Sequence, residues 1–318
     1  MEMQAENPLE TKPEVVENLA DFVGENNFLF FAAVCKGWRQ CWGVRPKVTK
    51  GAHEYTSLSQ LCFMIDCGWS RHFTCAPIAR LGKLHLLVFA WKEKCGLGPA
   101  TCTAAARGGH ITILDWALQH GCRWSYSTSR AAAANGHLPV LKWGLEKRCP
   151  VGHDECAEAA GRGDLPLLQS LRALEFPWNE GTSAKAAEAG HLDILNWVYV
   201  RGCEVDSRTC AAAALGGRLE VLRWARDHEI PWDEMTPISA AGMGHLEVLT
   251  FAVENGCPWD ERVVEKAAAY GQLEVVKWAL LNGCRFTDMV LYFARKMKRK
   301  DVIGWIVESG YPCGEYSV

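Results

Sequence analysis

Apolar and polar positions alternate along much of the chain with the period of an α-helix. In the segment HLPVLKWGLEKR, residues 137–148, the apolar positions share one broad helical face: Leu138, Val140, Leu141, Trp143 and Leu145. The charged side chains Lys142, Glu146 and Lys147 fall outside this face. Such spacing predicts an amphipathic helix that buries one side.

The same pattern returns at a fixed interval. A glycine recurs every 27 residues, at positions 82, 109, 136, 163, 190, 217, 244 and 271, and Lys298 continues the register. Leu or Ile follows each glycine two residues later, and an aromatic residue, usually Trp, follows most of them after seven. A unit this short cannot bury its apolar face alone and must stack on its neighbours. The sequence therefore predicts an all-α, helical-repeat solenoid of stacked helix-turn-helix units.

Each unit is expected to hold a long tryptophan-bearing helix, a tight turn and a short alanine-rich helix. Glycines recur five residues beyond the tryptophan position of a unit: Gly121, Gly202, Gly256 and Gly283. Glycine there can adopt the left-handed conformation that closes a helix. Threonines precede the alanine runs, where a hydroxyl can accept from free amides as an N-cap: Thr74, Thr101, Thr128, Thr182, Thr209 and Thr236.

Alanine and tryptophan predict complementary packing between the two helices. Alanine favours a helix and has little volume, so the short helices can approach each other closely. The tryptophans would then be buried anchors of the stack. On this interpretation Trp143→Ala costs about 3 to 5 kcal/mol.

The repeated motif T-x-x-A-A-A-x-x-G-H-L-x-V-L-x-W-x-x-x-x-G-C resembles the ankyrin repeat, most closely at residues 209–222 and 244–249. The resemblance extends over about residues 55–318. Three features differ: the period is 27 where ankyrin repeats use about 33, the T-P-L-H start is absent, and tryptophan stands where leucine is usual. The segment in which ankyrin repeats carry a projecting hairpin is also short. The resemblance implies a protein-binding scaffold, whereas the short segment departs from the family's usual binding mode.

Residues 13–43 lie outside the repeat. An apolar helix pattern, a break at Gly24 and a second apolar run are followed by V-C-K-G-W-R, an order that resembles an F-box. The resemblance implies docking on the linker subunit of a cullin-RING ubiquitin ligase through six residues: Val15, Val16, Leu19, Phe22, Val34 and Trp38. The usual leucine-proline start is replaced by Lys12-Pro13. The alternative is a helical cap that shields the first repeat.

The division expected from these patterns has four parts. Residues 1–12 would be a disordered N-terminus, 13–43 the F-box-like segment, 44–81 a linker with a degenerate first repeat, and 82–318 the regular repeats.

Composition and charge narrow the class of protein. With 34 basic and 37 acidic residues the net charge is -3, which does not favour binding to nucleic acid. The start of the chain lacks a secretory signal, and the run FLFFAAV at 28–34 is too short to cross a bilayer. We expect a monomeric intracellular protein, cytoplasmic or nuclear, with no membrane contact.

Histidines and cysteines recur with the repeat, and the spacing does not favour a metal site. Copies in stacked units lie roughly 8 to 10 Å apart and do not converge, so His110, His137, His191 and His245 are expected to be polar residues at a helix start. The 15 cysteines are expected to be reduced. The alternative is bridging within a unit between cysteines seven residues apart: Cys95 with Cys102, Cys149 with Cys156, and Cys203 with Cys210. No motif for a catalytic site or a cofactor is found, so we expect a protein that is not an enzyme.

The surface that recognises a partner is expected where the copies differ from one another. The ends of the short helices vary: Arg107, Asn135, Arg162, Glu188, Leu215, Met243 and Tyr270. The turns vary as well: Tyr126, Arg208, Glu234 and Arg262. The sequence thus predicts a protein interaction scaffold, either a substrate receptor of a ubiquitin ligase or a scaffold without any ligase connection. It names no partner.

Overall fold

The computed structural model describes residues 75–92 and 94–311, all of whose regular elements are α-helices. The 1–12 and 13–43 segments, with the F-box-like residues, lie outside the described residues, as do residues 44–74. The chain forms two compact units, residues 1–128 and 129–318. The boundary between them falls within one helix, at residues 126–134.

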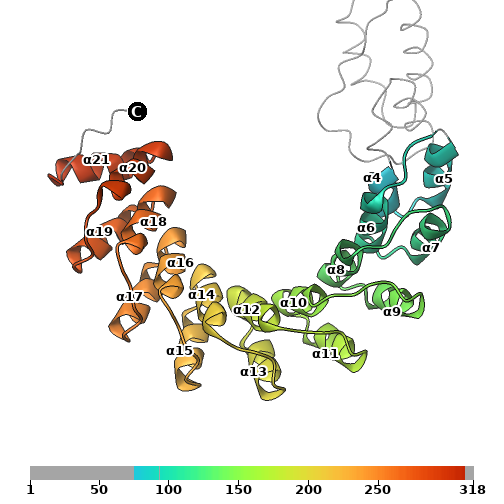
Figure 1. The fold of residues 1–318 in the computed structure, drawn as a ribbon, viewed down its shortest axis with the longest axis horizontal. Helices are drawn as coiled ribbons and strands as arrows, with labels where there is room; N and C mark the ends of the chain where they lie inside the picture. The colour runs from blue at the N-terminus through green and yellow to red at the C-terminus, as the bar shows by residue number, and fades with distance from the viewer. Residues whose placement is uncertain (1–74, 93, 312–318) are drawn as a thin grey trace, which may run out of the picture. The chain divides into compact units, whose positions relative to one another are not determined.

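The helices are of two kinds that alternate along the chain (Figure 1). Even-numbered helices are named alanine helices here: α4 (Cys75–Arg80), α6 (Pro99–Arg107), α8 (Tyr126–Ala134), α10 (Asp154–Gly161), α12 (Glu180–Ala189), α14 (Ser207–Leu215), α16 (Met235–Met243), α18 (Arg262–Tyr270) and α20 (Asp288–Lys296). Odd-numbered helices are named tryptophan helices: α5 (Leu84–Lys92), α7 (Ile111–Gln119), α9 (Leu138–Glu146), α11 (Leu165–Ala173), α13 (Leu192–Val200), α15 (Leu219–Asp227), α17 (Leu246–Glu254), α19 (Leu273–Leu281) and α21 (Lys300–Glu308). The predicted fold of stacked helix-turn-helix units is confirmed for both described parts.

The predicted contrast between a long and a short helix is wrong. Every tryptophan helix has nine residues, and most alanine helices also have nine. Two left-handed positions in each repeat lie just beyond the helix ends: α16, for example, ends at Met243 before Gly244, φ 79°, and Gly256, φ 81°, follows two residues after the end of α17. Where the second position lacks glycine, Arg148, Glu175 and Glu229 still take φ of 55–62°.

Alanine makes one row of helices pack more tightly than the other. In residues 129–318 neighbouring alanine helices lie against each other along their lengths, whereas neighbouring tryptophan helices touch at few points (Figure 1). Ala213, Ala240 and Ala267 are all fully buried in the alanine row. Small side chains therefore permit the close approach that the sequence predicts.

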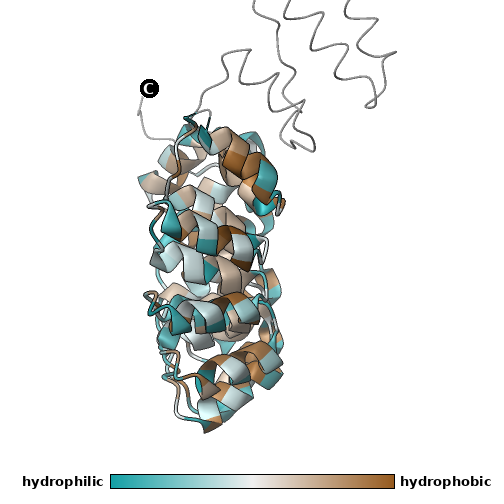
Figure 2. Ribbon diagram, turned by 90° about the vertical axis from the view of Figure 1, so that its right-hand side faces the viewer, coloured by the Kyte–Doolittle hydropathy of each residue, from teal (hydrophilic) through white to brown (hydrophobic). Residues whose placement is uncertain are grey.

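The core is made of aliphatic pairs from the tryptophan helices rather than of the tryptophans. Leu141, Ile194 and Leu195 are fully buried, whereas Trp143 and Trp197 are half-buried. Among the described tryptophans only Trp224, at 9% exposed, is buried. The prediction of buried tryptophan anchors is therefore wrong for most copies. In one copy the half-buried indole of Trp197 is partly covered by Trp178 of the preceding turn, with ring centroids 5.8 Å apart. Figure 2 shows hydrophobic and hydrophilic positions side by side on the helices.

Among the described residues the predicted threonines are not N-caps, and Thr74 lies outside the described residues. Asn179 and Asp206 are the N-cap residues of α12 and α14, and Thr182 and Thr209 lie three residues inside those helices, fully buried. At Thr101 the hydroxyl accepts from the backbone amide of the N-cap residue Gly98, at 3.4 Å. The hydroxyl of Thr101 thus accepts a hydrogen bond, as predicted. The donor, however, is the backbone amide of the N-cap residue and not an amide of the first helical turn.

Within the described residues, no helix combines the length and the apolar character that spanning a bilayer would require.

Candidate functional site

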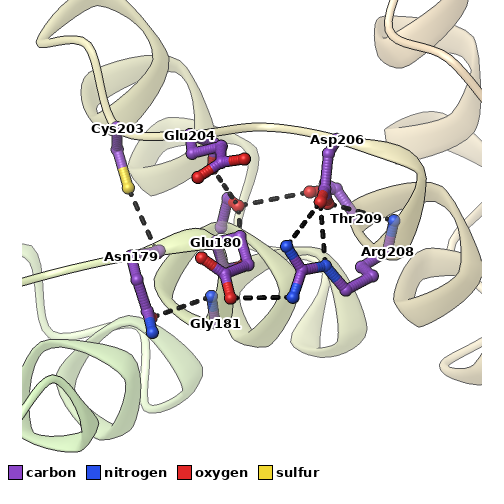
Figure 3. Close-up of polar contacts among 9 residues, drawn as sticks. Asn179, Glu180, Gly181, Cys203, Glu204, Asp206, Arg208 and Thr209 are labelled. Atoms are coloured by element: carbon purple, nitrogen blue, oxygen red, sulfur yellow. Dashed lines mark hydrogen bonds and ion pairs between the residues drawn. The ribbon is translucent and has the colours of Figure 1, made fainter.

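The first turns of the alanine helices carry ion pairs between neighbouring repeats. Figure 3 shows one copy, in which Arg208 of α14 contacts Asp206 of its own helix start and Glu180 of α12. Its guanidinium nitrogens lie 2.7 Å from a carboxylate oxygen of each residue. The N-cap residue Asn179 accepts from the amide of Gly181 at 3.0 Å. This arrangement fixes the start of one helix to the start of the next.

A second copy of this arrangement lies at α16 and α18. Arg262 contacts Asp260 at 2.7 Å and Glu234 at 3.4 Å. The hydrogen bond from Arg262 is the main cause that lowers the pKa of Asp260 below its ordinary value. These arginines are exposed, so each pair contributes little to stability because water screens it. Three residues predicted for partner binding, Arg208, Glu234 and Arg262, are thus already paired within the chain. Arg208 and Arg262 lie in first helical turns, and Glu234 is the N-cap residue of α16.

The opposite ends of the alanine helices are held by donors from the next repeat. In five repeats the residue after the first left-handed position donates to a carbonyl oxygen 30 residues earlier: His110 to Arg80 at 2.9 Å, Arg218 to Glu188 at 3.1 Å, His245 to Leu215 at 3.2 Å, Gln272 to Gly242 at 3.3 Å and Arg299 to Ala269 at 3.0 Å. The last carbonyls of a helix have no partner inside it, and these side chains satisfy one of them. His110 and His245 are the N-cap residues of α7 and α17, as expected for a helix start, but their side chains serve the preceding repeat.

No cluster of three or more metal-ligating side chains is found in residues 75–92 and 94–311.

Exposed apolar side chains gather at this same end in residues 129–318. Leu215, Met243 and Tyr270 are the last residues of α14, α16 and α18, and Met297 is the C-cap residue of α20. Their exposed fractions are 37%, 42%, 44% and 48%. These four helices pack successively against one another, so the four side chains lie at the same end of neighbouring helices, and this set is named the apolar edge here. Met297 was missed from the sequence, although it stands 27 residues after Tyr270, which itself stands 27 after Met243.

Lysines accompany the apolar edge. The ammonium of Lys266 lies 5.0 Å from the ring centroid of Tyr270, and that of Lys296 lies 5.5 Å from the ring of Tyr292 on α20. Both lysines are exposed. The edge can therefore offer an apolar surface and positive charge to the same partner.

The other predicted residues have separate environments. Arg107 is exposed in the first unit, as is Tyr126, at 62% exposed. In the second unit Asn135 donates to its own helix at Ala131, and Glu188 pairs with Lys185 at 2.8 Å. Arg162 donates to Ala134 at 2.9 Å. Leu215, Met243 and Tyr270 are exposed at the ends of successive alanine helices, whereas Arg162 and Glu188 have bonds within the chain.

The turn cysteines act as hydrogen-bond donors. Their thiols approach the carbonyl oxygen of the residue 24 positions earlier, at an alanine-helix start: Cys122 to Gly98 at 3.1 Å, Cys203 to Asn179 at 3.3 Å, Cys257 to Asp233 at 3.3 Å and Cys284 to Asp260 at 3.5 Å. Burial raises the pKa of Cys203 to about 11 and that of Cys257 to about 12. The ten cysteines in the described part of the chain are all free. The close sulfur contact, however, joins Cys102 to Cys122 rather than to Cys95.

No protein-family profile and no curated protein sequence matches the chain. Among solved structures, the human ASB11 ankyrin repeat domain is similar, with 17% sequence identity and a TM-score of 0.39 over 49% of this chain and 84% of that one.

Proposed function

We propose that residues 129–318 are a non-enzymatic scaffold that binds another protein along the apolar edge. The observation that carries this proposal is the row of Leu215, Met243, Tyr270 and Met297, each more than a third exposed, at the ends of four successive helices. Exposed apolar side chains that adjoin one another favour a binding surface, whereas scattered ones need no explanation. Aromatic residues and methionine are also the side chains enriched at protein interfaces.

The charges beside the edge favour an acidic partner. Lys266 and Lys296 are exposed next to aromatic rings, and the exposed Lys298 directly follows Met297. A suitable partner segment would bury its apolar side chains against the apolar edge. Its neighbouring carboxylates would pair with the lysines. The basic run at 295–300 contributes to this surface, although Arg299 already donates to Ala269.

The test compares proteins captured by the full chain and by variants. Replacing Met243 and Tyr270 together by serine should abolish retention of the specific partner. The matched control replaces Val200 and Leu281 by serine, because both are more than 80% exposed but lie at the ends of tryptophan helices, away from the edge. Retention should survive the control change and should fall with added salt. Equal retention by both double variants would overturn the proposal.

The sequence of residues 13–43 supports a more specific role as the substrate receptor of a cullin-RING ligase. The support is the order of apolar runs ending in V-C-K-G-W-R, which lies outside the described residues. Purified ligase linker subunit should bind the full chain and should lose binding when Val34 and Trp38 are both replaced by alanine. If the unmodified chain fails to bind the subunit, the ligase role is removed and the alternative of a scaffold with a capping N-terminal segment remains.

A further inference from the structure

Two thiols lie in contact in the first unit. Cys102 belongs to α6, and Cys122 lies in the turn after α7, 20 residues later. Their sulfur atoms are 2.7 Å apart, and the two residues are 0% and 5% exposed. In a disulfide bond the sulfur atoms are about 2.05 Å apart. The two sulfur atoms would therefore have to move only about 0.65 Å closer to form one.

Comparison with other repeats shows what is particular to this contact. Cys203, Cys257 and Cys284 occupy the same turn position as Cys122 and donate to the equivalent carbonyl oxygens. The residue 20 positions before each of them is not cysteine: Ser183, Pro237 and Val264. In the other pair with this spacing, Cys75 donates to the backbone oxygen of Cys95 at 3.8 Å.

The contact also changes the chemistry of Cys122. The hydrogen bond from the Cys102 thiol stabilises the Cys122 thiolate and lowers its pKa to about 7, against the opposing effect of burial. Cys203 lacks such a donor, and burial raises its pKa. Because the thiolate is the nucleophile of cysteine chemistry, Cys122 should be the more reactive turn cysteine at neutral pH.

We propose that Cys102 and Cys122 form a redox-active dithiol that closes to an intramolecular disulfide, with hydrogen peroxide as the oxidant. The Cys122 thiolate attacks a peroxide oxygen, the O–O bond breaks, and the departing hydroxide takes a proton to become water. This step leaves Cys122 as a sulfenic acid. The sulfur of Cys102 then attacks the sulfenic sulfur, and a second water leaves with the Cys102 proton. Two thiols lose two electrons in total, and one peroxide is reduced to two waters.

The bond would close a loop around the α6–α7 pair. Cys122 lies next to Gly121, a turn residue with left-handed φ. A Cβ atom added at Gly121 would meet no other atom within 4 Å. A small oxidant can therefore reach the pair through local opening of this turn, without unfolding of the helices. The disulfide would link the middle of α6 covalently to the turn after α7. In the reduced protein the Cys122 thiol donates a hydrogen bond to the carbonyl oxygen of Gly98 at the start of α6.

The test treats the folded full chain with hydrogen peroxide, blocks remaining thiols with an alkylating reagent, and maps the peptides by mass spectrometry. The expected product is a linked pair of peptides containing Cys102 and Cys122, lighter by two hydrogens than the separate peptides and released by a reducing agent. Recovery of both cysteines in alkylated form, under peroxide exposure that oxidises free glutathione completely, would overturn the proposal.

Two variants make the test specific. Cys102→Ser should fold, because serine occupies the equivalent position at Ser129 and Ser183. It should abolish the link and leave Cys122 as a sulfenic acid that a dimedone probe traps. Cys203→Ser, the matched control at a turn position whose thiol donates to a backbone oxygen, should leave the link unchanged. Absence of the trapped sulfenic acid in Cys102→Ser, under peroxide exposure that links the two cysteines of the unmodified chain, would also overturn the proposal.

Discussion

Arg162 donates a hydrogen bond to the carbonyl oxygen of Ala134, at 2.9 Å, in the repeat where Asp164 stands at the usual donor position. A carboxylate cannot donate to a carbonyl, and Asp164 instead accepts from the amide of Leu167 as the N-cap of α11. A guanidinium two residues earlier thus supplies the bond that histidine, arginine or glutamine supplies in other repeats.

Arg162→Ala should therefore destabilise the protein by about 1 kcal/mol, since it leaves the end of α8 without its donor. Urea denaturation followed by circular dichroism measures the change. Arg285→Ala, the removal of another exposed arginine, is the control and should change the free energy of unfolding by less than about 0.5 kcal/mol. Equal effects of the two substitutions would show that the bond to Ala134 contributes nothing.

The tryptophans differ in burial, so their replacement should differ in cost. Trp224 is 9% exposed, and its indole nitrogen donates to Asn196 of the preceding tryptophan helix at 2.7 Å. His228 also stacks on the ring, with centroids 4.4 Å apart. Trp224→Ala should cost about 3 to 4 kcal/mol, and Trp143→Ala, at a half-buried position, about 1 to 2 kcal/mol. Denaturation of the two variants under identical conditions measures the difference, and a larger loss for Trp143→Ala would contradict the assignment.

The case of tryptophan shows how far sequence reasoning reaches. The 27-residue spacing predicted the helices, the stacking and the left-handed turns, because these depend on local residue types that recur in every copy. The spacing did not reveal which face of a helix a neighbour covers. Trp197, for instance, is partly covered by Trp178 from a turn that the sequence reasoning did not single out.

The candidate site was predicted only in part for a related reason. Variation between copies marked Leu215, Met243 and Tyr270, which are exposed at the ends of successive helices, and it marked Arg162 and Arg208 equally. An arginine that varies can still bond to a neighbouring repeat, and the partner of such a bond lies 28 residues away in these two cases. Only coordinates separate these arginines from the exposed apolar side chains.

Two glycines should respond in opposite directions to alanine. A Cβ at Gly216 would lie 2.0 Å from the carbonyl oxygen of Glu188 in the preceding repeat, so backbone would have to shift. Gly304, inside α21, has open space around the same atom. Gly216→Ala should destabilise by about 1 to 3 kcal/mol through overpacking. Gly304→Ala should stabilise by about 0.5 to 1 kcal/mol because alanine favours a helix interior. Thermal melts of both variants check the signs, and stabilisation by Gly216→Ala would contradict the close approach of these repeats.

Glu155 stands where five other repeats have a buried threonine, at Thr101, Thr128, Thr182, Thr209 and Thr236. One carboxylate oxygen accepts from the amide of Gly152 at 3.1 Å, and the residue is fully buried. Burial is the main cause that raises the pKa of Glu155 above its ordinary value of 4.5. The protonated carboxyl therefore gives stability that is fully present below pH 4.5 and is lost as pH rises through the raised pKa.

Glu155→Thr should accordingly stabilise the protein by about 1 kcal/mol at pH 7, because a hydroxyl can accept from Gly152 without a buried charge. The gain should shrink as pH falls toward 4.5, where the wild-type carboxyl becomes neutral. Glu247→Thr is the matched control, since this exposed glutamate lies in the first turn of α17, and it should show no such pH dependence. Denaturation curves for the three proteins at several pH values measure the effect. A gain for Glu155→Thr that stays constant with pH would mean that ionisation of this carboxyl does not oppose folding.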